Sequence, residues 1–312
     1  MSESIKAMLP FAYFKNNIVP QGEARIAIAS HSLQYGTLCF SGMRGYAANK
    51  QARIIRLRDH YERLMNSVKI LGIDFYIEFE PFQSIISELI KKNAPGHDFY
   101  IRPFIFCDDE VLGPCIDGRT YHLAVYLLPL SQYFKRQGGL RMMISSHKKF
   151  SDSSLSTKAK ASGCYLNSAL ATSEARRAGY DEALMINDEG LVVEASVANL
   201  FIVYRGEIMT PPLGLGPLEG ITLRTIIELF KDEGINVSFA PLDRSMVLTA
   251  DEVFITGSAA QVSYVEMVNG RPIGPGLTPT MGPICQKAQE LFSQVISMEH
   301  PRSKQWMSVF AY

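Results

Sequence analysis

The stretch Lys158-Ala159-Lys160-Ala161-Ser162-Gly163-Cys164-Tyr165-Leu166-Asn167 places lysines among small residues directly before a helical pattern. A lysine amine held in a tight, partly desolvated turn can stay deprotonated near neutral pH and attack a carbonyl group. Lys160 is our candidate for such a nucleophile. Most lysines are solvated surface charges, so this stretch by itself leaves the surface interpretation open.

The composition narrows the class of partner. The chain has 312 residues, enough for two domains that each bury a core. Its 31 Lys and Arg residues balance its 31 Asp and Glu residues, so no net charge attracts it to nucleic acid or to an anionic membrane. We therefore expect small-molecule partners or further copies of the chain.

The cysteine pattern is typical of a reducing compartment. Five cysteines without a CxxC pair argue against a disulfide framework and a structural zinc site, and the six histidines lack HxxxH or HExxH spacing. The first residues, Met-Ser-Glu-Ser-Ile-Lys, do not follow a signal-peptide pattern, and no apolar run approaches the roughly 20 residues that span a bilayer. We expect a cytoplasmic protein with no metal site and no membrane segment.

Residues 1–129 mix helix and strand patterns and form the first predicted domain. Apolar residues at helical spacing predict one helix over 61–71 and a second that begins at Pro81. Pro103 lies inside a strand pattern and predicts an edge strand or a bulge there. Residues 130–139 are polar and irregular, so we place an interdomain loop there and a second domain at 140–312.

The second domain also mixes short strands with helices. A helix at about 166–178 ends at Gly179, and another opens at Gly220. Strand patterns cover 140–146, 183–186, 191–195, 200–204 and 253–256. Because regular βαβ alternation is missing, the predicted fold class is α+β in two domains.

Two short segments have the outline of an anion site. Gly220-Ile221-Thr222 opens a helix, where backbone N–H groups, the positive end of the helix dipole and a hydroxyl lie together. The alternative is that Thr222 only caps the helix. Thr256-Gly257-Ser258-Ala259 follows a strand pattern, and its small residues either admit a ligand to the backbone or form an ordinary loop.

Three charged residues near apolar patterns are candidate ligand contacts. Glu194 ends an apolar strand pattern, and a carboxylate there could keep a heterocyclic nitrogen protonated or simply face solvent. Arg63 flanks an apolar helical face, where it could reach a phosphate or extend into water. Arg102 lies inside an apolar strand pattern and needs an anionic partner, either a protein carboxylate or a substrate carboxylate.

Taken together, these residues resemble the class IV aminotransferases, the fold-type IV enzymes that use pyridoxal 5′-phosphate, and most closely the branched-chain amino acid aminotransferases. The resemblance covers residues 11–292 and is most specific over 160–166 and 173–183. It implies a small α/β sandwich domain and a larger pseudo-barrel α+β domain. It also implies that the amino group of L-leucine, L-isoleucine or L-valine passes to 2-oxoglutarate by a ping-pong exchange through pyridoxamine phosphate.

The resemblance assigns roles to individual residues. Lys160 would be the catalytic Schiff-base lysine and would move the proton between the substrate Cα and the cofactor C4′. Tyr165 would bind the phenolic oxygen of the cofactor, and Glu194 would pair with its pyridine nitrogen. The remaining cofactor contacts would be Arg63, Leu218, Ile221, Thr222 and Ser258.

The resemblance also implies a substrate wall and an oligomer. Tyr35 and Arg102 would hold the distal carboxylate of glutamate, while a hydrophobic pocket takes the branched side chain. We expect a homodimer or a higher homo-oligomer. The residues of the wall would be Tyr35, Phe40, Gly42, Arg44, Tyr100, Arg102, Leu130, Tyr133, Ser258 and Ala259.

The chain departs from the family pattern at Ser41, Leu112-Gly113-Pro114 and Leu130, and the last two lie where the side-chain pocket would be built. The range of amino donors is therefore open. The alternatives within the family are a D-amino acid or (R)-amine transaminase and an aminodeoxychorismate lyase. Outside it, the alternative is a non-enzymatic binder of phosphorylated metabolites.

Overall fold

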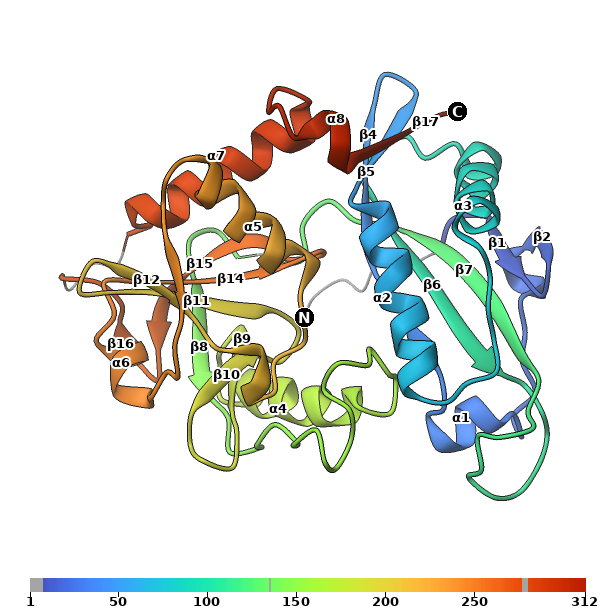
Figure 1. The fold of residues 1–312 in the computed structure, drawn as a ribbon, viewed down its shortest axis with the longest axis horizontal. Coiled ribbons are helices and arrows are strands. Elements are labelled where there is room, and N and C mark those ends of the chain that lie inside the picture. The colour runs from blue at the N-terminus through green and yellow to red at the C-terminus, as the bar shows by residue number, and fades with distance from the viewer. Residues whose placement is uncertain (1–7, 135, 277–279) are drawn as a thin grey trace. The chain divides into compact units, whose positions relative to one another are not determined.

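The computed structural model describes residues 8–134, 136–276 and 280–312, and the chain forms two compact units (Figure 1). The N-terminal residues on which we judged the signal peptide lie outside this described part. The first unit contains the described residues up to Tyr133 together with Ala159–Gly163 and Pro301–Tyr312. The second unit contains the described residues of Phe134–Lys158 and Cys164–His300. Two segments of 140–312, for which we expected a single domain, thus belong to the first unit.

The first unit is built on a mostly antiparallel sheet. The C-terminal strand β17 (Met307–Ala311) pairs with β5 (Gln51–Ile55) along five residues, which explains why the end of the chain belongs to this unit. Strand β3 (Cys39–Phe40) pairs with β6 outside the main path of the sheet. In spatial order the other strands are β17 (Met307–Ala311), β5 (Gln51–Ile55), β4 (Met43–Ala48), β6 (Phe99–Cys107), β7 (Tyr121–Pro129), β1 (Phe11–Phe14) and β2 (Asn17–Pro20).

The prediction that Pro103 marks an edge strand or a bulge is wrong, because β6 lies between β4 and β7 with an unbroken register. Pro103 lies opposite Ser41, between the short strand β3 and strand β4. The Pro103 carbonyl accepts a hydrogen bond from the Ser41 N–H, 2.9 Å away. An interior strand therefore tolerates a residue without an N–H at a position where the partner ladder is interrupted.

Two amphipathic helices pack against this sheet (Figure 1). The predicted helix over 61–71 is observed, and the second helix begins two residues before Pro81. The buried faces of these helices join the strands in one core that includes Leu64 and Phe82. The helices of the unit are α1 (His31–Tyr35), α2 (Leu57–Ile70), α3 (Phe79–Asn93) and α8 (Ser303–Trp306), with a 3₁₀ turn, η1 (Gln21–Glu23).

The second unit is built on a larger mixed sheet. Every second residue of β8 (Leu140–Ile144) belongs to the same core as residues of β10 (Val192–Ala195) and β14 (Glu252–Gly257). These residues of β8 are Leu140, Met142 and Ile144, and such convergence on one core is expected when a sheet curls. Strand β16 (Arg271–Pro272) pairs with β15 beside the main path. The spatial order is β10 (Val192–Ala195), β9 (Glu182–Ile186), β8 (Leu140–Ile144), β15 (Gln261–Val268), β14 (Glu252–Gly257), β11 (Asn199–Tyr204), β12 (Glu207–Thr210) and β13 (Val237–Phe239).

Helices lie on the outside of this curled sheet. Helix α4 (Tyr165–Arg177) packs on β9. Helices α5 (Ile221–Asp232) and α7 (Pro283–Ser297) pack on each other and on β14. The mixture of antiparallel and parallel pairs with helices confirms the predicted α+β class. No helix in the described part of the chain is long and apolar enough to span a bilayer. The helices are α4 (Tyr165–Arg177), α5 (Ile221–Asp232), α6 (Arg244–Leu248) and α7 (Pro283–Ser297), with a 3₁₀ turn, η2 (Leu213–Leu215).

Truncating a buried leucine of α2 tests the core of the first unit. Leu64 is fully buried, so Leu64→Ala should lower the free energy of unfolding by about 2–5 kcal/mol, the usual cost of such a cavity. Ile70→Ala is the control, because Ile70 lies on the same helix with 45% of its surface exposed, and its effect should stay within about 1 kcal/mol. Urea denaturation measures both, and equal losses would contradict the assigned packing.

Candidate active site

Lys160 lies in a segment that pairs with β3 and with the preceding Leu38 in the first unit. The Phe40 N–H donates to the Lys160 carbonyl at 2.9 Å, and the Ser162 N–H donates to the Leu38 carbonyl at 2.8 Å. A bridge between Cys39 and Ala161 lies between these two bonds. The backbone from the Lys160 carbonyl to Ser162 is therefore held by hydrogen bonds to another segment, which restricts where the Lys160 side chain can start.

Ser67, which the sequence did not single out, connects Lys160 to the helix that carries Arg63. The Lys160 N–H donates to the Ser67 Oγ at 3.0 Å, and this hydroxyl donates to the Arg63 carbonyl at 2.8 Å. Ser67 is fully buried on α2, one turn after Arg63. The predicted nucleophile and the predicted phosphate arginine are thus tied together in the first unit.

Aromatic rings surround the predicted substrate arginine. The Arg102 guanidinium lies 4.3 Å from the centre of the Phe40 ring and 5.1 Å from that of Tyr100, and it donates to the Tyr100 hydroxyl at 3.0 Å. The Lys160 Nζ lies 5.1 Å from the centre of the same Phe40 ring. The Arg102 guanidinium and the Lys160 amine therefore lie near the same ring, whose electronegative face favours the guanidinium cation.

Gly42 is a glycine because Tyr100 occupies the space of a side chain. A Cβ at Gly42 would lie 1.7 Å from the Tyr100 hydroxyl oxygen. Any larger residue would displace Tyr100, and with it the hydroxyl that receives the Arg102 hydrogen bond. Three of the predicted substrate residues thus depend on one another.

Other predicted substrate residues make separate contacts. Arg44 is buried and donates to the Asp98 carboxylate at 3.2 Å and to the Ser131 carbonyl, so protein acceptors already engage its guanidinium. The Tyr35 hydroxyl accepts a hydrogen bond from the Gly113 N–H at 3.0 Å. The side chain of Leu130 is buried, and Tyr133 is 41% exposed.

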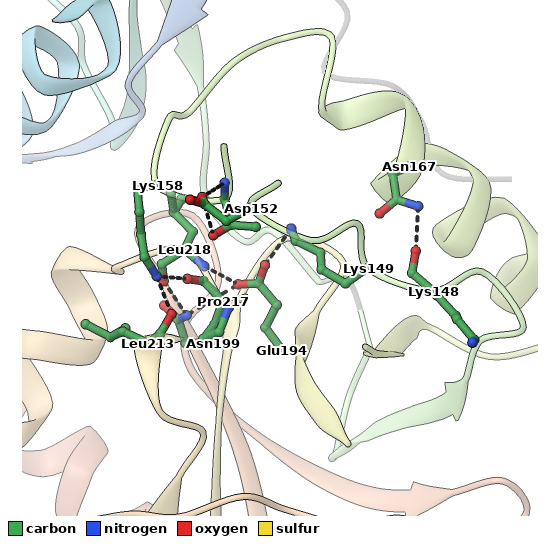
Figure 2. A network of polar contacts seen from close by, with 11 residues as sticks. Lys148, Lys149, Asp152, Lys158, Asn167, Glu194, Asn199, Leu213, Pro217 and Leu218 are labelled. Carbon is green, nitrogen blue, oxygen red and sulfur yellow. Dashed lines mark hydrogen bonds and ion pairs between the residues drawn. The ribbon is translucent and has the colours of Figure 1, made fainter. Parts of the chain in front are cut away.

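Glu194 in the second unit is a buried carboxylate with three donors. It lies in β10 with 5% of its surface exposed, so the solvated alternative is wrong. The Lys149 Nζ lies 2.7 Å from one carboxylate oxygen, the ion pair drawn as a dashed line in Figure 2. The Leu218 N–H, at 3.1 Å, and the Asn199 amide, at 3.4 Å, donate to the other oxygen. A buried charge needs such partners, because removal from water is costly.

Asn199 connects this carboxylate to the start of α5. Its amide also donates to the Leu218 carbonyl at 2.8 Å, while its carbonyl oxygen would lie 1.9 Å from a Cβ at Gly220. Gly220 is the N-cap of α5 and has no side chain that could cap the helix. The first N–H groups of α5, at Ile221 and Thr222, thus start beside Asn199 at the positive end of a 12-residue helix.

The predicted turn after β14 belongs to the same region of the second unit. Thr256 pairs with Asn199 across the β11–β14 ladder, and Gly257 approaches Ala198. Ser258 and Ala259 follow in a half-buried turn. The strand pairing therefore brings Ser258 to the end of the sheet where Asn199 and Gly220 lie.

Tyr165 is the first residue of α4, which packs against β9, the partner strand of β10. The side-chain amide of Asn167, in the same helical turn, donates to the Lys148 carbonyl at 2.9 Å (Figure 2). Lys149, the next residue, holds Glu194. The dipeptide Lys148-Lys149 thus contacts the first turn of α4 through the Lys148 carbonyl and the buried Glu194 carboxylate through the Lys149 amine.

Known proteins share both the sequence and this fold. The family model "Amino-transferase class IV" matches residues 38–267. The chain belongs to the class IV aminotransferases. A probable branched-chain-amino-acid aminotransferase from Aquifex aeolicus is 37% identical over 303 residues, which cover 96% of each chain.

Solved structures give the same result for the fold. A branched-chain aminotransferase from Thermoproteus uzoniensis, solved with norvaline, superposes with a TM-score of 0.91 at 35% identity and covers 97% of this chain and 99% of its own. A branched-chain amino acid aminotransferase from Thermobaculum terrenum, solved in its PLP form, gives a TM-score of 0.90 at 27% identity and covers 97% and 98%. These are proteins to which this class IV aminotransferase is similar.

Sequence reasoning missed several residues of this class IV aminotransferase. Lys149 and Asn199 contact Glu194 directly, yet each is an ordinary polar residue in its own sequence context. Asn199 begins an apolar strand pattern, which was a usable signal, because a polar residue at a buried strand end needs partners. Lys149 gave no comparable signal, since only the fold brings it to Glu194.

A second buried carboxyl group supports the strand of Glu194. The Ser196 hydroxyl donates to the Glu182 carboxylate at 2.5 Å, and the Ala183 N–H donates to the same oxygen at 2.7 Å. The Thr172 hydroxyl of α4 lies 2.7 Å from that of Ser196. Burial raises the pKa of Glu182, although the hydrogen bonds from Ser196 and Ala183 act in the opposite direction.

This raised pKa predicts a pH dependence of stability. The folded protein keeps the Glu182 proton to a higher pH than the unfolded chain, whose carboxyl has a pKa near 4.5, so the folded state binds more protons in this window. Wild-type stability should therefore fall as pH rises above 4.5 through the raised pKa, whereas Glu182→Gln cannot ionise and should not lose this contribution.

The measurement is the urea midpoint of both proteins from pH 4.5 to pH 8. The midpoint of E182Q should rise relative to that of the wild type as pH increases. Glu189→Gln is the matched control, because Glu189 is exposed on the following turn. A difference between E182Q and wild type that does not vary with pH would refute the assignment.

Proposed function

We propose that this chain is a pyridoxal-phosphate-dependent transaminase that transfers the amino group of branched-chain L-amino acids to 2-oxoglutarate. The proposal is carried by the Glu194 carboxylate, which is buried and held by three donors, as a group that pairs with a pyridine nitrogen would have to be. The names of the relatives support the substrate class, and the Thermobaculum terrenum structure in its PLP form supports the cofactor.

The donors and acceptors of the chain fit this cofactor. A phosphate dianion matches hydroxyl groups and the N-terminus of a helix, which Ser258, Thr222 and the start of α5 supply in the second unit. The resemblance adds Arg63, a residue of the first unit, as a further phosphate ligand. Within the described residues, the buried Thr256 hydroxyl, two residues before Ser258, has no hydrogen-bond partner. Gly220, just before the first residue of α5, leaves room for the Asn199 side chain, because a Cβ at Gly220 would lie 1.9 Å from the Asn199 Oδ1.

When bound, pyridoxal phosphate supplies an aldehyde and an electron-withdrawing ring. Lys160 would bind the cofactor and then carry the proton that leaves the substrate Cα. Glu194 would hold a proton on the pyridine nitrogen, because a carboxylate beside a cation favours the charged form of both. Tyr165 would donate to the phenolic oxygen, and Leu218 would lie against the ring.

The aromatic surroundings of Arg102 offer a route to two kinds of substrate. With its guanidinium over Phe40 and bonded to the Tyr100 hydroxyl, Arg102 leaves an apolar wall for a branched side chain. The same guanidinium could leave the ring to pair with the distal carboxylate of glutamate, together with Tyr35. Arg44 would shape this wall from its pairing with Asp98.

We also propose that the enzyme acts in the cytoplasm as a homodimer or a higher homo-oligomer. The five cysteines of the structure are free, which suits a reducing compartment. The expectation of an oligomer comes from the resemblance to the family. Analytical ultracentrifugation of the purified protein measures the oligomeric state.

Covalent labelling tests the cofactor assignment. The purified protein with pyridoxal phosphate should be yellow, and borohydride reduction followed by peptide mapping should place a pyridoxyl group on Lys160. Lys160→Ala should lose the label and nearly all transaminase activity, whereas Lys148→Met, at an exposed lysine, should keep both. Reversible binding without a label on Lys160 would favour the non-enzymatic alternative and refute the proposal.

A panel of amino donors tests the substrate class. With 2-oxoglutarate as acceptor, kcat/KM should be highest for L-leucine, L-isoleucine and L-valine, and at least about 100-fold lower for D-alanine, because the apolar wall must match the donor side chain. Keto-acid formation under identical conditions gives the comparison. A preference for D-alanine or an (R)-amine would instead identify another class IV activity.

A further inference from the structure

Lys158 occupies an unusual position for a lysine, two residues before Lys160. Its half-buried side chain lies in the second unit, where the Nζ donates to the carbonyls of Leu213 and of Pro217, the latter at 3.2 Å (Figure 2). Both acceptors belong to the loop between β12 and α5. Lys158 therefore ties the segment that leads to Lys160 to a loop more than 50 residues later in the chain.

This loop delivers a donor to the buried carboxylate. Leu218, the residue after Pro217, donates its N–H to Glu194 and accepts from the Asn199 amide. If the loop moved, the Leu218 N–H would move with it, and the Glu194 oxygen would lose one of its donors. A carboxylate with fewer donors is less stable as a buried charge and less sharply oriented.

The environment of Lys158 makes this tether stronger than a surface contact. Burial lowers the pKa of the Lys158 amine, and the carboxylates of Asp152 and Glu194 act in the opposite direction. A partly desolvated amine has few water molecules to bind, so its N–H groups depend on the two loop carbonyls. A Cβ at Gly216, in the same loop, would be in ordinary van der Waals contact with Lys149 and Thr157.

We propose that Lys158 is a positioning residue of the cofactor site: by holding the Leu213 and Pro217 carbonyls, it sets the Leu218 N–H and thereby the Glu194 carboxylate. This inference rests on the proposed function, since Glu194 is the residue assigned to the pyridine nitrogen. Lys158 itself needs no contact with the cofactor. Its effect passes through Leu218 and Glu194.

A double-mutant cycle on pyridoxal phosphate binding tests the proposal. Lys158→Met keeps most of the side-chain volume but removes the donors, and should weaken the affinity of the apoprotein for pyridoxal phosphate by about tenfold or more. In a Glu194→Gln background the same substitution should change the affinity by less than about twofold, because coupled residues are not additive. The absorption spectrum of the cofactor bound to K158M should shift towards that of E194Q.

Two further variants control the cycle. Lys231→Met removes an exposed lysine of the same unit, in the last turn of α5, and should bind pyridoxal phosphate like the wild type. Lys158→Arg retains donors for both carbonyls and should recover most of the affinity lost in K158M. Should K158M fail to fold, Lys158→Gln takes its place in both backgrounds, because its shorter side chain cannot hold both carbonyls. A loss as large in E194Q as in wild type would then contradict the coupling.

The results that would contradict the role of Lys158 differ from those that would contradict the proposed function. Wild-type affinity in K158M, or an equal loss in the wild-type and E194Q backgrounds, would overturn the role of Lys158 while leaving the proposed function intact. A wild-type protein that binds no pyridoxal phosphate would overturn the proposed function itself.

Discussion

The arrangement of the second unit depends on keeping one carboxylate charged while it is buried. Glu194 is almost fully removed from water, and the free energy of that burial is offset by an ion pair with Lys149 and by donors from Leu218 and Asn199. These donors come from three separate segments. The segment after β8, the start of β11 and the loop before α5 must therefore all be correctly placed for the charge to be tolerated.

In the first unit, the backbone of Lys160 is held in a defined position from which its flexible side chain extends. Phe40 and Ser67 bond the carbonyl and the N–H of Lys160. The same Phe40 ring faces the Arg102 guanidinium. The candidate nucleophile and the candidate substrate arginine thus share one aromatic neighbour, so that a change at this ring is expected to affect both.

Local patterns predicted the secondary structure well where one face of an element is buried. Helix α2 and strand β10 follow from apolar residues, and the end of α4 follows from Gly179, because those signals are contained in each segment. Pairing between distant segments carries no such signal. Pro103 was therefore assigned to an edge strand or a bulge, and no local signal showed that 159–163 and 301–312 group with the first unit, since that grouping follows from pairing with β3 and β5.

By itself, the sequence determined the α+β class, the helices and the residue types of an amine, a carboxylate and an anion-binding helix start, because these depend on composition and short-range spacing. Only the tertiary structure decided which polar groups serve Glu194 and Lys160. Three of these polar groups belong to residues that look like ordinary surface residues in the sequence, namely Lys149, Ser67 and Lys158. Their roles arise from contacts across up to about 90 residues of sequence. Desolvation makes those contacts necessary, and desolvation exists only in the folded protein.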